Sequence, residues 1–199
     1  MTEADQIVEL AASLFARGFS VGSAGNISVR TEHGFLMTPT NSSLGRLNAE
    51  SLAQLDSQFN HVSGDRPSKE VVMHRACYEA RPDANAVVHL HSTYATAAAC
   101  LPDRRIPLLT PYFVMRVGGR LPVVPYFRPG DPRMQDAVRE ACRDARALLL
   151  ANHGSLVAGA TLPDAVDVAE ELEESAHLAV LLHGREPREL TAEQIAELV

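Results

Sequence analysis

The chain has 199 residues, 46% of them hydrophobic, which is enough to bury one core, so we expect a single domain over residues 1–199. The formal net charge of −7 and the lack of a Lys/Arg run disfavour a nucleic-acid partner, although a small anionic ligand needs only a few local cations. No stretch approaches the roughly 18 apolar residues of a membrane span, and the first residues lack signal-peptide features. We therefore expect a soluble, cytoplasmic protein.

The first part of the chain predicts a helix followed by a hairpin. Apolar residues recur at helical spacing until Gly18, where such a helix would end. They are Ile7, Val8, Ala11, Leu14 and Phe15. Turn-forming residues fill positions 21–28, and His33-Gly34 then marks a turn into the apolar residues 35–37. We expect a β-hairpin at the edge of a sheet.

The middle of the chain alternates between predicted helices and strands. Ser68 is suited to cap a helix over residues 69–80, and the apolar run 86–91 indicates a buried strand. A short Ala/Thr-rich helix over residues 92–100 follows, and we expect a further strand over residues 122–126.

The last part of the chain continues this alternation. Asp131 and the proline after it begin an amphipathic helix, and Leu148–Leu150 indicates another buried strand. Thr161–Asp164 opens a long helix that ends near Gly184, and a short helix begins at Thr191. Because helices and strands interleave, we expect an α/β architecture in which helices cover a central sheet.

Two histidines lie two residues apart on the predicted strand that ends at His91. Since side chains alternate along a strand, His89 and His91 share one face and can bind one ion. A third histidine, His153, follows the apolar run 148–150 and precedes Gly154, which would let a substrate approach closely. Three histidines with an open fourth position are typical of a catalytic zinc site. The alternative, that each histidine only satisfies hydrogen bonds in the core, stays open here.

Glu70 is the candidate acid/base of such a site. A metal that stabilises an oxyanion still requires a carboxyl group that moves a proton to or from carbon. From spacing alone, a solvated first-turn glutamate favoured by the helix dipole is the better interpretation of Glu70. The remaining histidines show no comparable arrangement, so we interpret them as structural or surface residues. They are His33, His61, His74, His177 and His183.

Short motifs over almost the whole chain together resemble the class II aldolase/adducin family in order and spacing. They are Ser23-Ala-Gly-Asn-Ile-Ser28, Thr38-Pro-Thr40, Pro67-Ser-Lys-Glu70, His89-Leu-His91 and Asn152-His-Gly154. The resemblance implies that His89, His91 and His153 are metal ligands and that Glu70 is the catalytic acid/base. The set of three histidines favours Zn²⁺ as the cofactor. Histidine nitrogen also suits Mn²⁺ and other divalent metals, so the identity of the metal stays open.

The fuculose-phosphate aldolase branch of this family implies a site for a substrate phosphate. The corresponding residues here are Gly25, Asn26, Thr40, Asn41, Ser68 and Lys69. Two of them depart from the family pattern, because Asn41 replaces a glycine and Lys69 replaces a second serine. Lysine adds a point charge that suits phosphate or carboxylate, whereas a lysine beside a helix start is more often only solvated.

Further segments resemble the 3-oxo-tetronate 4-phosphate decarboxylase branch. They are His89–Tyr94, Thr110–Tyr112, Met115-Arg116 and Pro125–Asp131. This resemblance implies a phosphorylated four-carbon sugar acid that loses carbon dioxide through a metal-stabilised enediolate, with Glu70 supplying the proton at C2, to give dihydroxyacetone phosphate. Tyr112 corresponds to a tyrosine that family aldolases use across a subunit boundary. An ordinary half-buried tyrosine is an equally good interpretation.

The resemblance also implies a three-layer α/β/α fold with a central mixed, largely antiparallel sheet, and a homotetramer with sites at subunit interfaces. A sugar-phosphate aldolase, an epimerase or a dehydratase of the family would keep the same metal. The adducin head, a non-enzymatic assembly module with this fold, is the alternative from another class, and the complete ligand set argues against it. The residues that distinguish the D from the L configuration at C2 of the substrate stay open, with Arg116, Arg128 and residues of a neighbouring subunit as candidates.

Overall fold

A computed structural model describes residues 1–103, 105–128 and 131–198 of the chain. The strands are β1 (Asn26–Thr31), β2 (Gly34–Met37), β3 (Ala53–Leu55), β4 (His61–Ser63), β5 (Ala86–Leu90), β6 (Val123–Val124), β7 (Ala147–Leu150) and β8 (Gly154–Gly159). These eight strands form one sheet in the order β4-β3-β2-β1-β5-β8-β7-β6. Only β6 and β7 pair in parallel within this sheet, so it is mixed and largely antiparallel, as the resemblance implied.

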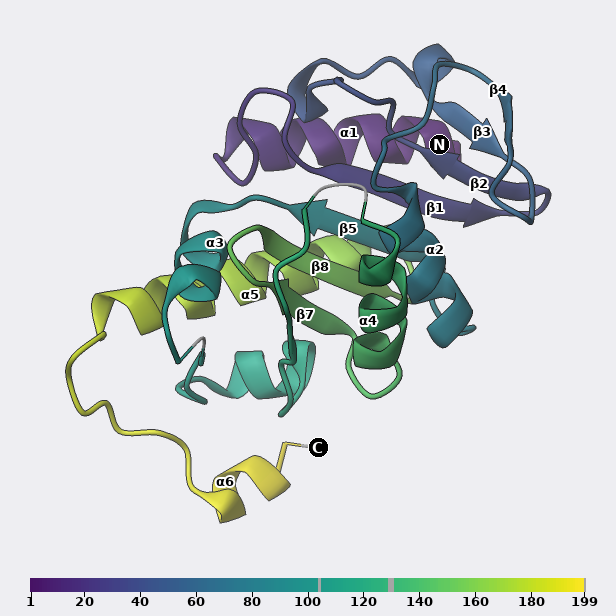
Figure 1. The fold of residues 1–199 in the computed structure, drawn as a ribbon. Helices are drawn as coiled ribbons and strands as arrows, with labels where there is room; N and C mark the ends of the chain where they lie inside the picture. Colours follow the sequence, from purple (N-terminus) through teal and green to yellow (C-terminus); the bar gives the residue numbers. More distant parts are fainter. Residues whose placement is uncertain (104, 129–130, 199) are drawn as a thin grey trace.

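Helices cover both faces of the sheet (Figure 1). They are α1 (Glu3–Ala16), α2 (Val71–Ala80), α3 (Thr93–Cys100), α4 (Arg133–Cys142), α5 (Leu162–Leu181) and α6 (Ala192–Ala196), with shorter helical segments at Leu44–Arg46, Ala49–Ser51 and Phe113–Val117. The helices α1, α3 and α5 pack on one face, whereas α2 and α4 pack on the other, which confirms the three-layer α/β/α fold. Across the described part of the chain, no helix combines the length and apolar character of a membrane span.

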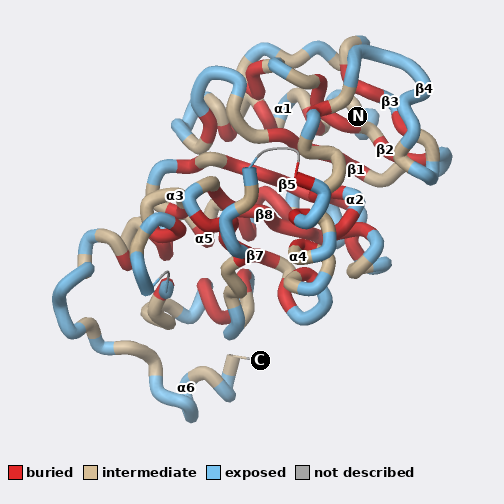
Figure 2. The backbone as a smooth tube through the Cα atoms, in the orientation of Figure 1, coloured by how far each residue is buried: buried red, intermediate tan, exposed pale blue. Residues whose placement is uncertain are grey.

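Each face of the sheet has its own apolar core. Along β5, Val88 and Leu90 pack with α3 and α5, while Val87 packs with α2 and α4. Figure 2 shows β5, β7 and β8 as largely buried between these layers. Because side chains alternate along a strand, His89 points to the same face as Val87, toward α2.

The predicted first helix and hairpin are confirmed, but the hairpin does not lie at the edge of the sheet. Helix α1 buries Ile7, Ala11 and Leu14 and ends before Gly18, which has a φ of +82°. Strand β1 pairs with β5 and strand β2 pairs with β3, so both strands of the hairpin are internal. The prediction missed β3 and β4, because these strands have three residues each and all three residues of β4 are exposed to solvent.

Two element boundaries differ from the prediction. Helix α2 begins at Val71 rather than at residue 69, because the Ser68 carbonyl accepts a hydrogen bond from Val71 N and the Ser68 hydroxyl accepts one from Glu70 N. Glu70 therefore lies in a turn just before the helix. The strand expected over residues 122–126 is reduced to Val123–Val124, whose parallel partner is β7.

Candidate active site

Three histidines from two separate segments meet where β5 ends. His89 is the penultimate residue of β5, His91 directly follows the strand, and His153 lies in the turn between β7 and β8. Strand β8 runs antiparallel to β5 with Ser155 opposite Leu90. The start of β8 therefore lies beside the end of β5, which brings His153 next to the other two histidines.

The geometry of this cluster is compact. The Nε2 atoms of His89 and His91 lie 2.8 Å apart, and the His153 ring centroid is 4.9 Å from that of His89 and 4.6 Å from that of His91. Glu70 completes the group, since its Oε1 lies 3.2 Å from His153 Nε2 and its Oε2 lies 3.4 Å from His89 Nε2. One donor atom from each of the four residues lies within 4.8 Å of the others.

Two of the three histidines, His89 and His91, are held in the state that binds a metal. The Nδ1 of His89 lies 2.7 Å from the carbonyl oxygen of Ser155 and donates its hydrogen there, so Nε2 keeps its lone pair toward the cluster. Burial lowers the pKa of His89 to about 4 and also lowers the pKa of His91. Both imidazoles are therefore neutral near pH 7, as metal coordination requires.

The donor set fits a divalent metal ion. Nitrogen ligands bound to zinc at about 2.0–2.1 Å in a tetrahedron lie roughly 3.3 Å from one another. The contacts among the four side chains span 2.8–3.4 Å, close to that separation. Neutral imidazole and carboxylate are suitable ligands for zinc, manganese or iron. His89, His91 and His153 would hold the ion, with Glu70 beside it.

Glu70 faces the histidines rather than solvent. Its side chain is 21% exposed, and Asn26 Nδ2 donates a hydrogen bond to its Oε2 over 2.7 Å. Burial raises the pKa of Glu70, but the hydrogen bond from His153, the positive charge that His89 gains when it is protonated at low pH, and the hydrogen bond from Asn26 outweigh it and hold the pKa well below its usual range. The alternative of a solvated first-turn glutamate therefore does not describe this side chain.

The segments assigned to phosphate by resemblance are tied to one another by backbone hydrogen bonds. Thr40 N donates to the Arg66 carbonyl over 2.9 Å, and Ser68 N donates to the Thr38 carbonyl over 3.2 Å. Thr38 also exchanges hydrogen bonds with Ile27, next to Gly25 and Asn26, where β1 begins. The three segments thus meet beside Glu70, while Lys69 is exposed on the turn between Ser68 and Glu70.

Backbone conformation explains two of the residues in these segments. Asn41, which departs from the family glycine, has a φ of +58°, a left-handed conformation that asparagine adopts more readily than most residues. Gly25 has a φ of +78°, and a Cβ there would lie 2.9 Å from the carbonyl oxygen of His89. The departure at Asn41 therefore preserves the turn, and Gly25 permits the close approach to β5.

Gly154 permits a close approach between two strands. A Cβ at this position would lie 2.3 Å from the carbonyl oxygen of Leu90 and 3.3 Å from the His91 Cα. The glycine thus permits β8 to approach the end of β5, which places His153 beside His91. The prediction missed β8 altogether, because four of its six residues are small and its two larger apolar residues, Leu156 and Val157, are adjacent, so the strand period does not show.

Tyr112 lies on the surface, away from the four donor groups. Its side chain is 62% exposed, and it lines a hollow with Phe19, Arg116 and acidic residues of α5. Arg116 forms an ion pair with Asp167 over 2.8 Å. Arg128 is exposed, and the motif that contains it extends into residues 129–130, which lie outside the described residues.

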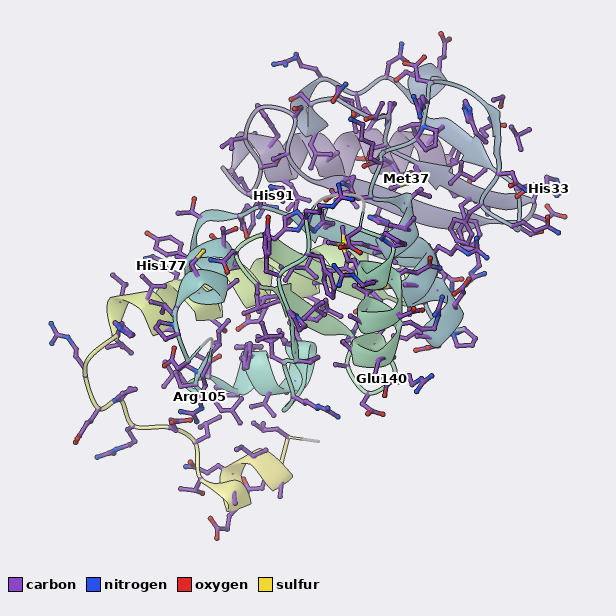
Figure 3. The ribbon with its side chains drawn as sticks, viewed as in Figure 1. His33, Met37, His91, Arg105, Glu140 and His177 are labelled. Atoms are coloured by element: carbon purple, nitrogen blue, oxygen red, sulfur yellow. The ribbon has the colours of Figure 1, made fainter. Side chains whose placement is uncertain are left out.

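Among the histidines interpreted as structural or surface residues, His74 is the one that contacts the site. His33, His61 and His183 are exposed, and Figure 3 shows His33 at the tip of the β1–β2 hairpin, far from His91. His177 stacks on Tyr94. His74 is fully buried and bonds to Asn26. Its position four residues after Glu70, on the same helical face, was the available signal.

The chain is similar to known proteins over nearly its whole length. Residues 5–180 match the family model described as Class II Aldolase and Adducin N-terminal domain. The 3-oxo-tetronate 4-phosphate decarboxylase of Haemophilus influenzae is 46% identical over 203 residues, which cover 100% of this chain and 96% of that protein. The L-fuculose phosphate aldolase of Escherichia coli is 36% identical over 176 residues, which cover 88% and 81%, respectively.

The crystal structure of YgbL from Klebsiella pneumoniae has a TM-score of 0.95 with this structure, at 47% identity and with 100% of both chains covered. The similarity to this fold extends over the full chain. The family match and the identity to the decarboxylase likewise cover nearly all of it. The chain therefore belongs to the class II aldolase and adducin family.

Proposed function

We propose that this chain is a metal-dependent lyase that decarboxylates a 3-oxo-tetronate 4-phosphate to dihydroxyacetone phosphate and carbon dioxide. The main support for this proposal is the convergence of one ligand atom from each of His89, His91, His153 and Glu70. Relatives that are 46% and 48% identical over nearly their full length bear the name of this decarboxylase. Zn²⁺ is the proposed metal, with Mn²⁺ as the alternative.

The substrate is a β-keto acid, so its bond between C1 and C2 can break with the electron pair moving toward the C3 oxygen. A divalent ion held by the three histidines would supply Lewis-acid stabilisation for negative charge on the substrate oxygens. Glu70 relays a proton from water to C2 once carbon dioxide has left, because it is the carboxylate beside the histidines.

The segments that lie beside Glu70 bind the substrate phosphate in this proposal. They comprise Gly25, Asn26, Thr40, Asn41, Ser68 and Lys69. Asn26 supports this role, because its amide nitrogen donates one hydrogen to Glu70 and keeps a second for a substrate oxygen. The ammonium group of Lys69 adds the positive charge that suits a dianionic phosphate or a carboxylate.

The proposed assembly is a homotetramer with sites at subunit interfaces, in the cytoplasm. The exposure of Tyr112 supports the assembly, since a tyrosine on the surface can reach a neighbouring chain. In this arrangement Tyr112 contributes to the site of the next subunit as a proton donor or binding residue.

A sugar-phosphate aldolase is the second candidate, favoured by the 36% identity to L-fuculose phosphate aldolase. Both reactions place negative charge beside a carbonyl, and they differ in the fragment that leaves. The decisive experiment incubates metal-loaded protein with each C2 epimer of 3-oxo-tetronate 4-phosphate and, separately, with L-fuculose 1-phosphate. We expect equal amounts of carbon dioxide and dihydroxyacetone phosphate from one epimer. Aldehyde release from the sugar phosphate without decarboxylation of either epimer would overturn the proposal.

A further inference from the structure

A chain of buried hydrogen bonds connects helix α2 and strand β1 to Glu70. His74 Nε2 lies 2.6 Å from Asn26 Oδ1, and the Asn26 amide nitrogen donates to Glu70. On the other side of its ring, His74 Nδ1 lies 2.7 Å from the hydroxyl of Ser28. The Ser28 hydroxyl lies 2.9 Å from that of Tyr78, which also donates to the Ser28 carbonyl over 3.0 Å.

The spacing of these residues explains how the chain of bonds arises. Asn26 and Ser28 are two residues apart on β1 and share a face of the sheet. Glu70, His74 and Tyr78 are four residues apart, so they line one side of α2 from its N-cap onward. Packing of α2 on β1 brings the two sets together, polar group against polar group.

Burial makes each of these bonds matter. The exposed fraction is 0% for His74, 1% for Ser28 and 4% for both Asn26 and Tyr78. A buried polar group that loses its hydrogen-bond partner cannot bond to water instead. The free-energy cost of removing that group from water is then left uncompensated. Burial also lowers the pKa of His74 to about 3, so the ring is neutral near pH 7 and carries one hydrogen.

When Glu70 is ionised, only one assignment of hydrogen-bond donors and acceptors gives every group in this network a partner. A carboxylate only accepts, so Asn26 must turn its NH₂ toward Glu70 and its Oδ1 toward His74. His74 Nε2 must then carry the ring hydrogen, and Nδ1 must accept from the Ser28 hydroxyl. With the opposite amide orientation, Oδ1 would face the carboxylate and the two oxygens would repel each other.

We propose that His74 is a positioning residue, which as the Nε2–H tautomer orients the Asn26 amide so that its NH₂ holds Glu70 beside the three histidines. This inference rests on the proposed function, in which Glu70 transfers the proton. His74 itself reaches neither substrate nor metal. It acts through Asn26, and its removal leaves that amide free to rotate.

Two variants distinguish the loss of the hydrogen-bond donor of His74 from the loss of the volume of its ring. His74→Met fills similar space without a donor, whereas the amide nitrogen of His74→Gln can donate from near the position of Nε2. We expect His74→Met to lower kcat about 10–100-fold with metal content unchanged, as the loss of outer partners of active sites does. His74→Gln should recover most of kcat. Equal losses in both variants would overturn the proposal.

A double-mutant cycle tests whether His74 acts through Asn26. In an Asn26→Ala background, His74→Met should lower kcat by less than about twofold, because its target is already gone. If the fold losses in kcat of the two single variants multiply in the double variant, His74 acts independently of Asn26, which would contradict the inference. Cys142→Ala is the matched control, since this side chain is buried on α4 outside the network. It should lower stability and leave kcat unchanged.

The tautomer can be measured without any assay of activity. Nitrogen NMR of isotopically labelled, metal-loaded protein distinguishes a protonated from an unprotonated ring nitrogen, and the spectrum of His74→Gln assigns the signals. We expect His74 to be protonated at Nε2 and unprotonated at Nδ1. Protonation at Nδ1 would overturn the inference even if decarboxylation is observed. Conversely, the absence of decarboxylation would defeat the proposed function and leave this result standing.

Discussion

The two faces of the central sheet are buried to a similar degree, but they hold different kinds of side chain. Toward α1, α3 and α5, the packed residues include Ile27, Val88 and Leu149. Toward α2, an apolar cluster continues into the buried polar residues Asn26, His74 and His89. Adjacent residues of β1 and β5 therefore serve packing on one face and the candidate site on the other. We expect substitutions on the first face to change stability, and substitutions of the buried polar residues on the second face to change chemistry.

The largest effect should come from a metal ligand. His153→Ala removes one of three imidazoles, so we expect metal content and activity to fall together, with kcat reduced about a thousandfold or more, since the metal supplies several kcal/mol of stabilisation. Elemental analysis of the purified protein and steady-state kinetics measure the two quantities. Full metal occupancy in this variant would contradict the ligand assignment.

Glu70→Gln should separate metal binding from proton transfer. The amide keeps the shape of the side chain but cannot carry the proton, so we expect normal metal content and a kcat lowered about 10²–10⁴-fold. The same two measurements apply, with the wild-type protein as reference. Unchanged turnover would rule out the acid/base role of Glu70.

Leu149→Ala tests the opposite face of the sheet. Leu149 is fully buried among apolar residues, and its truncation leaves a cavity. We expect the free energy of unfolding to fall by about 2–5 kcal/mol, with metal content and kcat of the folded protein unchanged. Urea unfolding followed by circular dichroism measures the first quantity. A selective loss of kcat would show that the faces are less independent than their packing indicates.

The smallest expected effect is an acid sensitivity that originates from His74. Its pKa is about 3 in the folded protein and 6.5 in the absence of burial, so the unfolded chain binds more protons between these values. The stabilisation is complete above pH 6.5 and declines as the pH falls toward 3, by about 2 kcal/mol between pH 6.5 and pH 5. Urea unfolding at pH 7 and pH 5 should show a smaller pH dependence in His74→Gln. Identical behaviour of both proteins would contradict this origin.

Local patterns predicted those parts of the fold that depend on neighbours in sequence. The stripe of Ile7, Ala11 and Leu14 is buried on α1, and the Thr161 side chain caps α5 by accepting from Asp164 N, as the sequence indicated. Strands β3, β4 and β8 were missed, because short or small-residue strands are defined by their pairing partners. The edge position of the hairpin was wrong for the same reason, since pairing of β1 with β5 leaves no local signal.

By itself, the sequence determined that His89 and His91 share a face, because the period of a strand is a local property. It also carried the motifs of the family. The tertiary structure decided the rest of the site. His153 arrives through the pairing of β8 with β5, and Asn26 reaches Glu70 because α2 packs across β1. These contacts join residues far apart in the chain, so their geometry depends on how layers pack rather than on any periodicity within a segment.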